Sequence, residues 1–103
     1  MDYSPAMKVG AAVCSARRGG LTATFDGINK YFTISGMPVA SGQYWNGIHG
    51  NSAAEAQQDG EGMQTMRNLA RNMAWMLKCI EAGKQQGIAL PETEHGSITN
   101  FIR

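Results

Sequence analysis

The spacing of hydrophobic and polar positions changes several times along this chain, and each change predicts a different element. The first pattern, at residues 7–14, is mostly small or apolar, contains two valines and is too short for a helix. It predicts a buried strand. A second apolar run, at residues 37–40, predicts a short strand whose proline stands at its beginning, where it interrupts no ladder bond.

Between these two strands, apolar residues recur at helical spacing. The residues that share this face are Leu21, Phe25, Ile28 and Phe32. They predict a helix over residues 22–34, with Thr22 or Thr24 as its N-cap and residues 35–36, Ser-Gly, as its end. Strand, helix and strand in this order predict a right-handed βαβ unit with a parallel sheet.

The longest pattern lies near the C-terminus and alternates spacings of three and four residues. Its members are Met63, Met66, Ala70, Met73, Leu77 and Ile80. We expect a helix over residues 61–82, ending near Gly83 or Gly87, with this methionine-rich stripe packed on the sheet. Just before it, Ser52 is expected to cap a short turn at residues 53–58.

Two loops between these elements carry most of the polar chemistry. The first, at residues 15–20, reads Ser-Ala-Arg-Arg-Gly-Gly and follows the apolar strand directly. Open α/β sheets bind ligands at the carboxyl ends of their strands. Two glycines there let backbone N–H groups approach an anion or a flat ring. An ordinary strand-to-helix turn with solvated Arg17 and Arg18 explains the same residues, and both interpretations stay open.

The second loop, at residues 41–51, holds three glycines, two asparagines, a histidine and two adjacent aromatic residues, Tyr44 and Trp45. Large aromatic side chains in a loop need a surface to contact. They either contact a ligand or a partner chain, or they cover the open end of the sheet.

Composition narrows the classes of function. The chain has 103 residues and a formal net charge of +1, so it is one domain with no electrostatic preference for nucleic acid or an anionic membrane. No apolar run approaches the ~20 residues of a spanning helix, and the first residues carry no secretion signal. We therefore expect a cytoplasmic protein.

The chain has only two cysteines, Cys14 and Cys79, and they lie far apart in the sequence. The two histidines, His49 and His95, are isolated as well, so we expect no metal site.

Several strings of residues resemble the NADPH-dependent FMN reductase family, on its branch related to iron–sulfur flavoproteins. These strings are residues 15–20, 29–39, 43–46, 49–50, 72–75 and 99–103. The resemblance covers nearly all of residues 7–103. It implies an α/β, flavodoxin-like three-layer fold with a parallel sheet, of which this chain supplies only the C-terminal β-α-β-α portion. Residues 1–6 are then a flexible lead-in, and residues 7–103 a partial flavodoxin-like domain.

The resemblance also implies a function, that of an FMN-binding, NAD(P)H-dependent oxidoreductase module. By position it places one loop near the isoalloxazine ring: Ser15, Ala16, Arg17, Arg18, Gly19 and Gly20. It places Tyr44 and Trp45 near the same site or at a subunit contact. In this family an N-terminal half holds the FMN phosphate, so we expect function to depend on such a half or on oligomerisation. The alternative is a non-catalytic remnant or oligomerisation module with no bound flavin.

A homo-oligomer is also expected on physical grounds. In a flavodoxin-like sheet, the strand at residues 7–14 would be an inner strand, and with one neighbour missing it would present an open apolar edge. A chain of this length also buries little surface by itself. We therefore predict a homo-oligomer, foremost a two-fold dimer, with that edge or the methionine-rich helix face in its interface.

Overall fold

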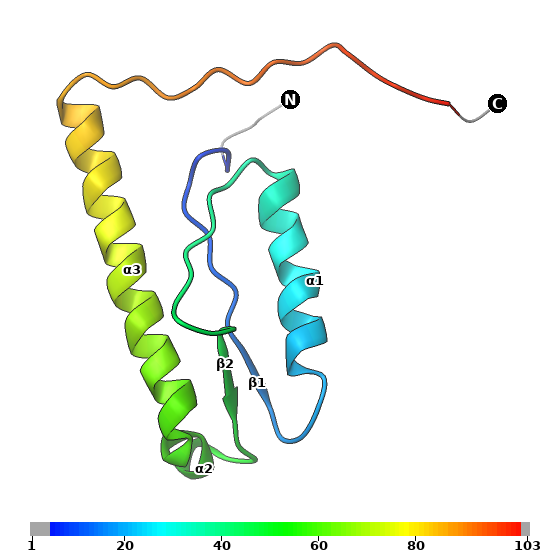
Figure 1. Cartoon of the computed structure of the whole chain (residues 1–103), viewed down its shortest axis with the longest axis vertical. Helices are drawn as coiled ribbons and strands as arrows, with labels where there is room; N and C mark the ends of the chain where they lie inside the picture. The colour runs from blue at the N-terminus through cyan, green and yellow to red at the C-terminus, as the bar shows by residue number, and fades with distance from the viewer. Residues whose placement is uncertain (1–4, 102–103) are drawn as a thin grey trace.

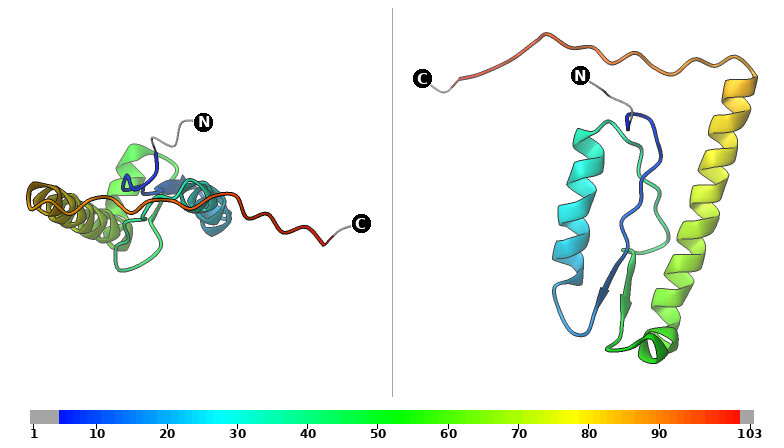
Figure 2. Two further views of the ribbon diagram at one scale, coloured as in Figure 1. Left: turned by 90° about the horizontal axis from the view of Figure 1, so that it is seen from above. Right: turned by 180° about the vertical axis from the view of Figure 1, so that it is seen from behind.

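The computed structural model describes residues 5–101 and shows a small mixed α/β chain. Its elements, in chain order, are β1 (Cys14–Ala16), α1 (Leu21–Ile34), β2 (Gly47–His49), α2 (Ala53–Gln58) and α3 (Gly60–Gln85). Figure 1 shows α1 and α3 on opposite sides of the two strands, and the views in Figure 2 agree. The chain measures 49 × 48 × 21 Å along its principal axes, and these extents include residues 88–101, which form no helix or strand and run from the end of α3 past α1 (Figure 1). Residues 1–4 of the expected lead-in lie outside the described residues.

The sheet is a two-stranded parallel ladder. Cys14–Ala16 pairs with Gly47–His49 in register, and an isolated parallel bridge joins Gly10 to Val39 earlier in both segments. Two hydrogen bonds of 2.9 Å secure this bridge, one from the N–H of Gly10 to the C=O of Pro38 and one from the N–H of Ala40 to the C=O of Gly10. The parallel pairing predicted for a βαβ unit is thus confirmed, with α1 as the connection.

The predicted bounds of the strands were wrong. β1 begins at Cys14, so that Ser15 and Ala16 belong to the strand and not to the loop after it. Residues 37–40 form only the single bridge at Val39. β2 lies inside the segment that was predicted to be a loop, residues 41–51.

A buried asparagine explains why pairing with β1 resumes after residues 41–45, at β2. Residues 41–45 leave the sheet, and the side chain of Asn46, only 2% exposed, takes their place beside β1. Its Nδ2 donates to the C=O of Ala12 at 2.9 Å, and the N–H of Cys14 donates to the C=O of Asn46 at 3.1 Å. A side-chain amide in a strand ladder leaves no period-2 signal, so the pattern of the sequence could not predict it.

Helix α1 has the predicted apolar face and a different start. Of its four face residues Leu21 is buried and the rest are half-buried. Neither Thr22 nor Thr24 caps the helix, because the N-cap is Gly20 at φ +92°, and the Thr24 hydroxyl donates to the C=O of Gly20. The end at Ser35 and Gly36 is confirmed, with Gly36 at φ +71°.

Helix α3 packs on the sheet through a different face from the one predicted. Its buried residues are Gly62, Thr65 and Leu69, whereas Leu77 is 49% and Ile80 41% exposed. The predicted methionine-rich stripe was therefore wrong as the packing face. The short β2 supports only the first turns of α3, and the helix continues well past the sheet (Figure 1). The capped turn at α2 is confirmed, with Ser52 accepting from the N–H of Glu55.

Two glycines allow both helices to approach β2 closely. A Cβ atom at Gly47 would lie 2.2 Å from Cδ2 of Leu21, and one at Gly62 would lie 3.0 Å from the C=O oxygen of Gly47. Within residues 5–101, the buried apolar side chains are Ala12, Leu21, Ala40 and Leu69. In that range no helix has both the length and the apolar content to cross a membrane.

Candidate functional site

A cleft of about 490 Å³ lies along β2, between the first turn of α1 and the first turns of α3. Three segments build it. The turn before α1 contributes Arg18, Gly19 and Gly20, and the loop before β2 contributes Tyr44 and Trp45. The opposite wall consists of His49, Asp59, Glu61, Gly62 and Thr65. The cleft therefore joins both loops that the sequence marked as chemically informative.

The turn before α1 leaves its backbone accessible. Gly20 adopts φ +92°, which glycine tolerates without strain, and it offers no side chain to cap the helix. A Cβ atom at Gly19 or Gly20 would meet no described atom within 4 Å. The first turn of α1 contains no acidic residue, and exposed Arg17 and Arg18 precede it. Guanidinium groups and the positive end of a helix dipole both favour a ligand that is rich in electrons.

The loop before β2 is fastened to α3 by side-chain amides. Nε2 of Gln43 donates to Oγ1 of Thr65 at 2.8 Å, and Nδ2 of Asn68 donates to Oε1 of Gln43 at 2.7 Å. Further along the helix, Nδ2 of Asn72 donates to the C=O of Ser41 at 2.7 Å. These bonds hold the loop in one position before any ligand arrives.

The two aromatic side chains at the tip of this loop contact one another. The ring centroids of Tyr44 and Trp45 lie 4.9 Å apart at an interplanar angle of 50°. Tyr44 is 58% and Trp45 51% exposed. More than half of each residue thus faces solvent, which agrees poorly with a role as cover for the sheet. Exposed aromatic faces beside a cleft suit contact with a flat ligand or with another chain.

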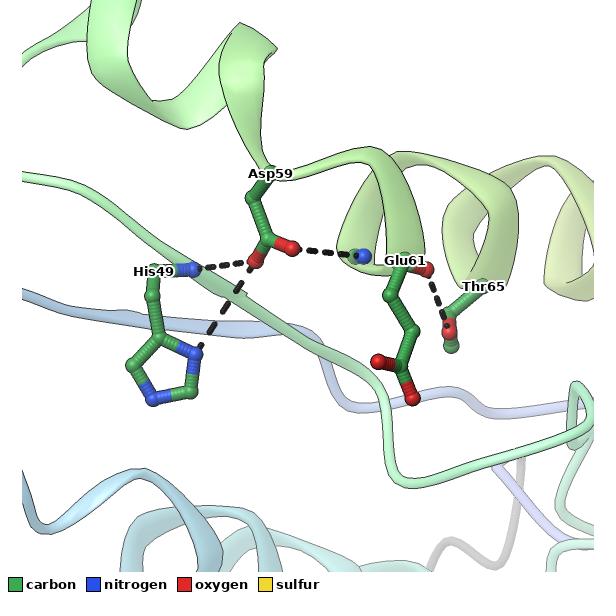
Figure 3. Close-up of polar contacts among 5 residues, drawn as sticks. His49, Asp59, Glu61 and Thr65 are labelled. Atoms are coloured by element: carbon green, nitrogen blue, oxygen red, sulfur yellow. Dashed lines mark hydrogen bonds and ion pairs between the residues drawn. The ribbon is translucent and has the colours of Figure 1, made fainter.

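Asp59 connects β2 to α3 at the base of the cleft (Figure 3). Its Oδ2 accepts the N–H of His49 at 2.8 Å, and its Oδ1 accepts the N–H of Gly62 at 3.0 Å, which makes it the N-cap of α3. These bonds, first from His49 and then from Gly62, lower the pKa of Asp59 against a smaller opposing effect of burial. The His49 imidazole, whose Nδ1 lies 3.9 Å from Oδ2, lowers this pKa slightly further. Asp59 is therefore a carboxylate at neutral pH.

Not all the predicted site residues share this cleft. Ser15, Ala16 and Arg17 line a second depression of about 380 Å³, which also borders the turn before α1. Arg18, Gly19 and Gly20 lie between the two hollows and border both. The turn before α1 can thus be approached by a ligand from two sides.

Sequence reasoning missed the acidic wall of the cleft. Glu61 continues the wall begun by Asp59, and the hydroxyl of Thr65 donates to the C=O of Glu61 at 3.0 Å (Figure 3). An aspartate directly before a helix is a known N-cap signal, and it could have located this residue. The cleft carries a cation on one wall and two carboxylates on the other, so it suits a neutral or dipolar ring better than a free polyanion.

Across residues 5–101, no three His, Cys, Asp or Glu side chains gather to form a metal site. Cys14 and Cys79 are both free thiols.

Comparison of the chain with protein-family models, curated proteins and solved structures gave no match.

Proposed function

We propose that this chain binds the ring of a flavin and is part of a flavodoxin-like, FMN-dependent NAD(P)H oxidoreductase. The observation that carries the proposal is a cleft beside a parallel ladder that is lined both by an open, cationic glycine turn and by an aromatic pair. The βαβ connection and the helices on both sides of the sheet agree with a flavodoxin-like layer arrangement. The choice of FMN as the cofactor rests on the resemblance of the sequence to FMN reductases.

The residues of the cleft fit the isoalloxazine part of FMN. This ring is flat, has apolar faces and carries carbonyl acceptors along one edge. The volume of about 490 Å³ lies within the range of small-ligand sites. Backbone N–H groups near Gly19 and Gly20 and the guanidinium of Arg18 would donate to the carbonyl edge, while Tyr44 and Trp45 would contact a face.

The same residues do not provide a second place for the phosphate. The starts of α2 and α3 are capped by Ser52 and Asp59, and the carboxylate of Asp59 would repel a phosphate. The start of α1 belongs to the turn that we assign to the ring. We therefore infer that the phosphate is held outside residues 5–101, by further polypeptide or by a partner chain.

The role of this chain in the reaction is to bind and orient. When bound, FMN would supply the chemistry that moves a hydride from NAD(P)H and electrons to an acceptor. Arg18 would stabilise negative charge at the carbonyl edge of the ring, and Tyr44 and Trp45 would keep water from one face. No acid or base from this chain is required. We expect the protein to act in the cytoplasm, where thiols such as Cys14 and Cys79 stay reduced.

A non-catalytic interaction module is the second candidate function, and the small set of buried apolar residues favours it.

Flavin binding is tested by titrating the purified chain with riboflavin and, separately, with FMN, followed by flavin fluorescence. Because we place only the ring in this cleft, both should bind with similar affinity. The double variant Arg17→Ala/Arg18→Ala should bind riboflavin roughly tenfold or more weakly, since hydrogen bonds to a charged donor contribute about 1.5–3 kcal/mol each.

A matched control removes the same charge elsewhere. Arg67→Ala/Arg71→Ala changes two exposed arginines on α3 that do not border the cleft, and it should bind riboflavin like the parent. Both double variants should keep the free energy of unfolding within about 0.5 kcal/mol for each substitution. If the parent binds neither flavin, or if the two double variants bind equally, the flavin assignment is wrong and the interaction module remains.

A further inference from the structure

The isolated chain exposes more surface than a compact monomer of its size. Its accessible surface is 8092 Å², whereas a folded monomer of 11.1 kDa exposes about 5,700 Å². The excess of about 2,400 Å² includes the surface of residues 88–101, which form no helix or strand and are exposed throughout (Figure 1).

Backbone hydrogen bonds show where one open surface lies. Along residues 9–16 the bonds to the β2 side alternate, and they involve every second residue: Gly10, Ala12, Cys14 and Ala16. In a parallel ladder the residues between them direct their N–H and C=O groups to the opposite side. On that side, Val9, Ala11 and Val13 form no hydrogen bond within the described chain. Ser15, between bonded Cys14 and Ala16, has the same orientation.

This edge has the properties of a strand that pairs with another strand. Residues 9–16 read Val-Gly-Ala-Ala-Val-Cys-Ser-Ala and contain no charged side chain. Val13 is 56% exposed. Natural edge strands that must stay unpaired are usually protected by lysine, proline or a bulge, and this one has none of these between residues 9 and 16. The helices lie on the two faces of the sheet and leave the edge open (Figure 2).

We propose that this edge pairs with the same edge of a second copy of the chain, antiparallel about a two-fold axis. One register satisfies all the open groups. With the axis at Ala12, Val9 faces the partner's Ser15 and Ala11 faces the partner's Val13, so that each of these residues exchanges both of its bonds.

The side chains along the edge suit that register. Ala12 meets the partner's Ala12 in a non-hydrogen-bonded pair, where Cα atoms approach to about 4.5 Å and a small side chain is needed. Lys8 and Arg17 flank the uncharged segment and mark where pairing ends. The dimer then has one four-stranded sheet with β1 at its centre.

The test uses sedimentation velocity of the whole chain at micromolar concentration, with reductant present so that no disulfide can join two copies. The parent should sediment as a dimer. Val13→Pro removes one N–H donor per copy that has no bond within its own chain, and it should raise the dissociation constant roughly tenfold or more. Val13→Thr, which keeps both the N–H and the branched shape, should remain a dimer.

Amide hydrogen exchange of the parent provides a readout that does not depend on any variant folding. The amides of Val9, Ala11 and Val13 should exchange slowly in the dimer and become faster on dilution to the monomer. A parent that is monomeric at tens of micromolar would overturn the proposal. So would a dimer whose Ala11 and Val13 amides exchange freely, or a Val13→Pro variant that dimerises as tightly as the parent.

Discussion

The contact between Gly47 and Leu21 allows a quantitative test of how α1 packs on the sheet. A Cβ atom at Gly47 would lie 2.2, 2.5 and 2.8 Å from Cδ2, Cδ1 and Cγ of Leu21. Leu21 is only 8% exposed, so its side chain cannot turn into solvent without emptying the core. Overpacking of this kind costs about 1–3 kcal/mol. Replacing a glycine also restricts the unfolded chain, which offsets about 0.4–1 kcal/mol. We expect Gly47→Ala to lower the free energy of unfolding by about 1–2 kcal/mol.

The same substitution at a second glycine should act in the opposite direction. Gly27 lies inside α1, and a Cβ atom there would meet no described atom within 4 Å. Gly27→Ala should raise the free energy of unfolding by about 0.5–1 kcal/mol, because alanine is the better helix former. Leu21→Ala alone should lower it by about 2–5 kcal/mol. The double variant Leu21→Ala/Gly47→Ala should lose less free energy of unfolding than the sum of the two single losses, by at least about 1 kcal/mol. The reason is that alanine at position 21 removes the atoms with which the new Cβ atom clashes.

The assay is urea unfolding followed by far-UV circular dichroism. All variants are compared at one protein concentration, since association couples to folding. A Gly47→Ala variant as stable as the parent would contradict the packing described here. Strict additivity of Gly47→Ala and Leu21→Ala would contradict it as well, because two residues in steric conflict must show coupling.

Two further predictions concern α3. Leu69→Asp places an unpaired charge in the core and should unfold the chain at room temperature. Leu77→Asp, at a half-exposed position, should change the free energy of unfolding by about 0.5 kcal/mol or less. Equal losses of the two variants in urea unfolding would contradict the assigned packing face of α3. The pKa of Asp59 is lowered from its ordinary value of 3.8, so its stabilising contribution is complete above that value and is lost as pH falls through the lowered pKa. Asp59→Asn keeps an N-cap acceptor without the charge, and its acid unfolding profile should be flatter than the parent's in that range; identical profiles would show that Asp59 does not titrate with folding.

The helices of this chain follow from spacing, and so does a parallel pairing across α1, although the predicted second strand, residues 37–40, forms only the bridge at Val39. The cleft was partly predictable, because Arg18 and two glycines follow a strand and Tyr44 lies in a loop rich in polar residues. Both features are local in sequence. Local chemistry therefore located these two loops of the cleft, but not the acidic wall that Asp59 and Glu61 form.

The remaining features depend on contacts between distant residues. β2 reads Gly-Ile-His, which has no strand pattern, and it is a strand because Asn46 and the bonded face of β1 hold it there. The packing face of α3 depends on how closely Gly62 lets the helix approach β2, and this distance is set in three dimensions. Asp59 accepts an N–H from His49, ten positions away in the chain, and no helical or strand period marks such a pair.

The bond from Asn46 to Ala12 also means that changes in the loop at residues 41–45 need not change the register of the sheet. Pairing is fixed at Gly10 and Val39 before the loop, and at Cys14 and the backbone of Asn46 after it. Because both ends are anchored to the same strand, the register does not depend on the length or composition of residues 41–45. The tip of the loop, at Tyr44 and Trp45, can thus vary during evolution or engineering while the sheet stays unchanged, whereas Gln43 must stay to hold the loop on α3.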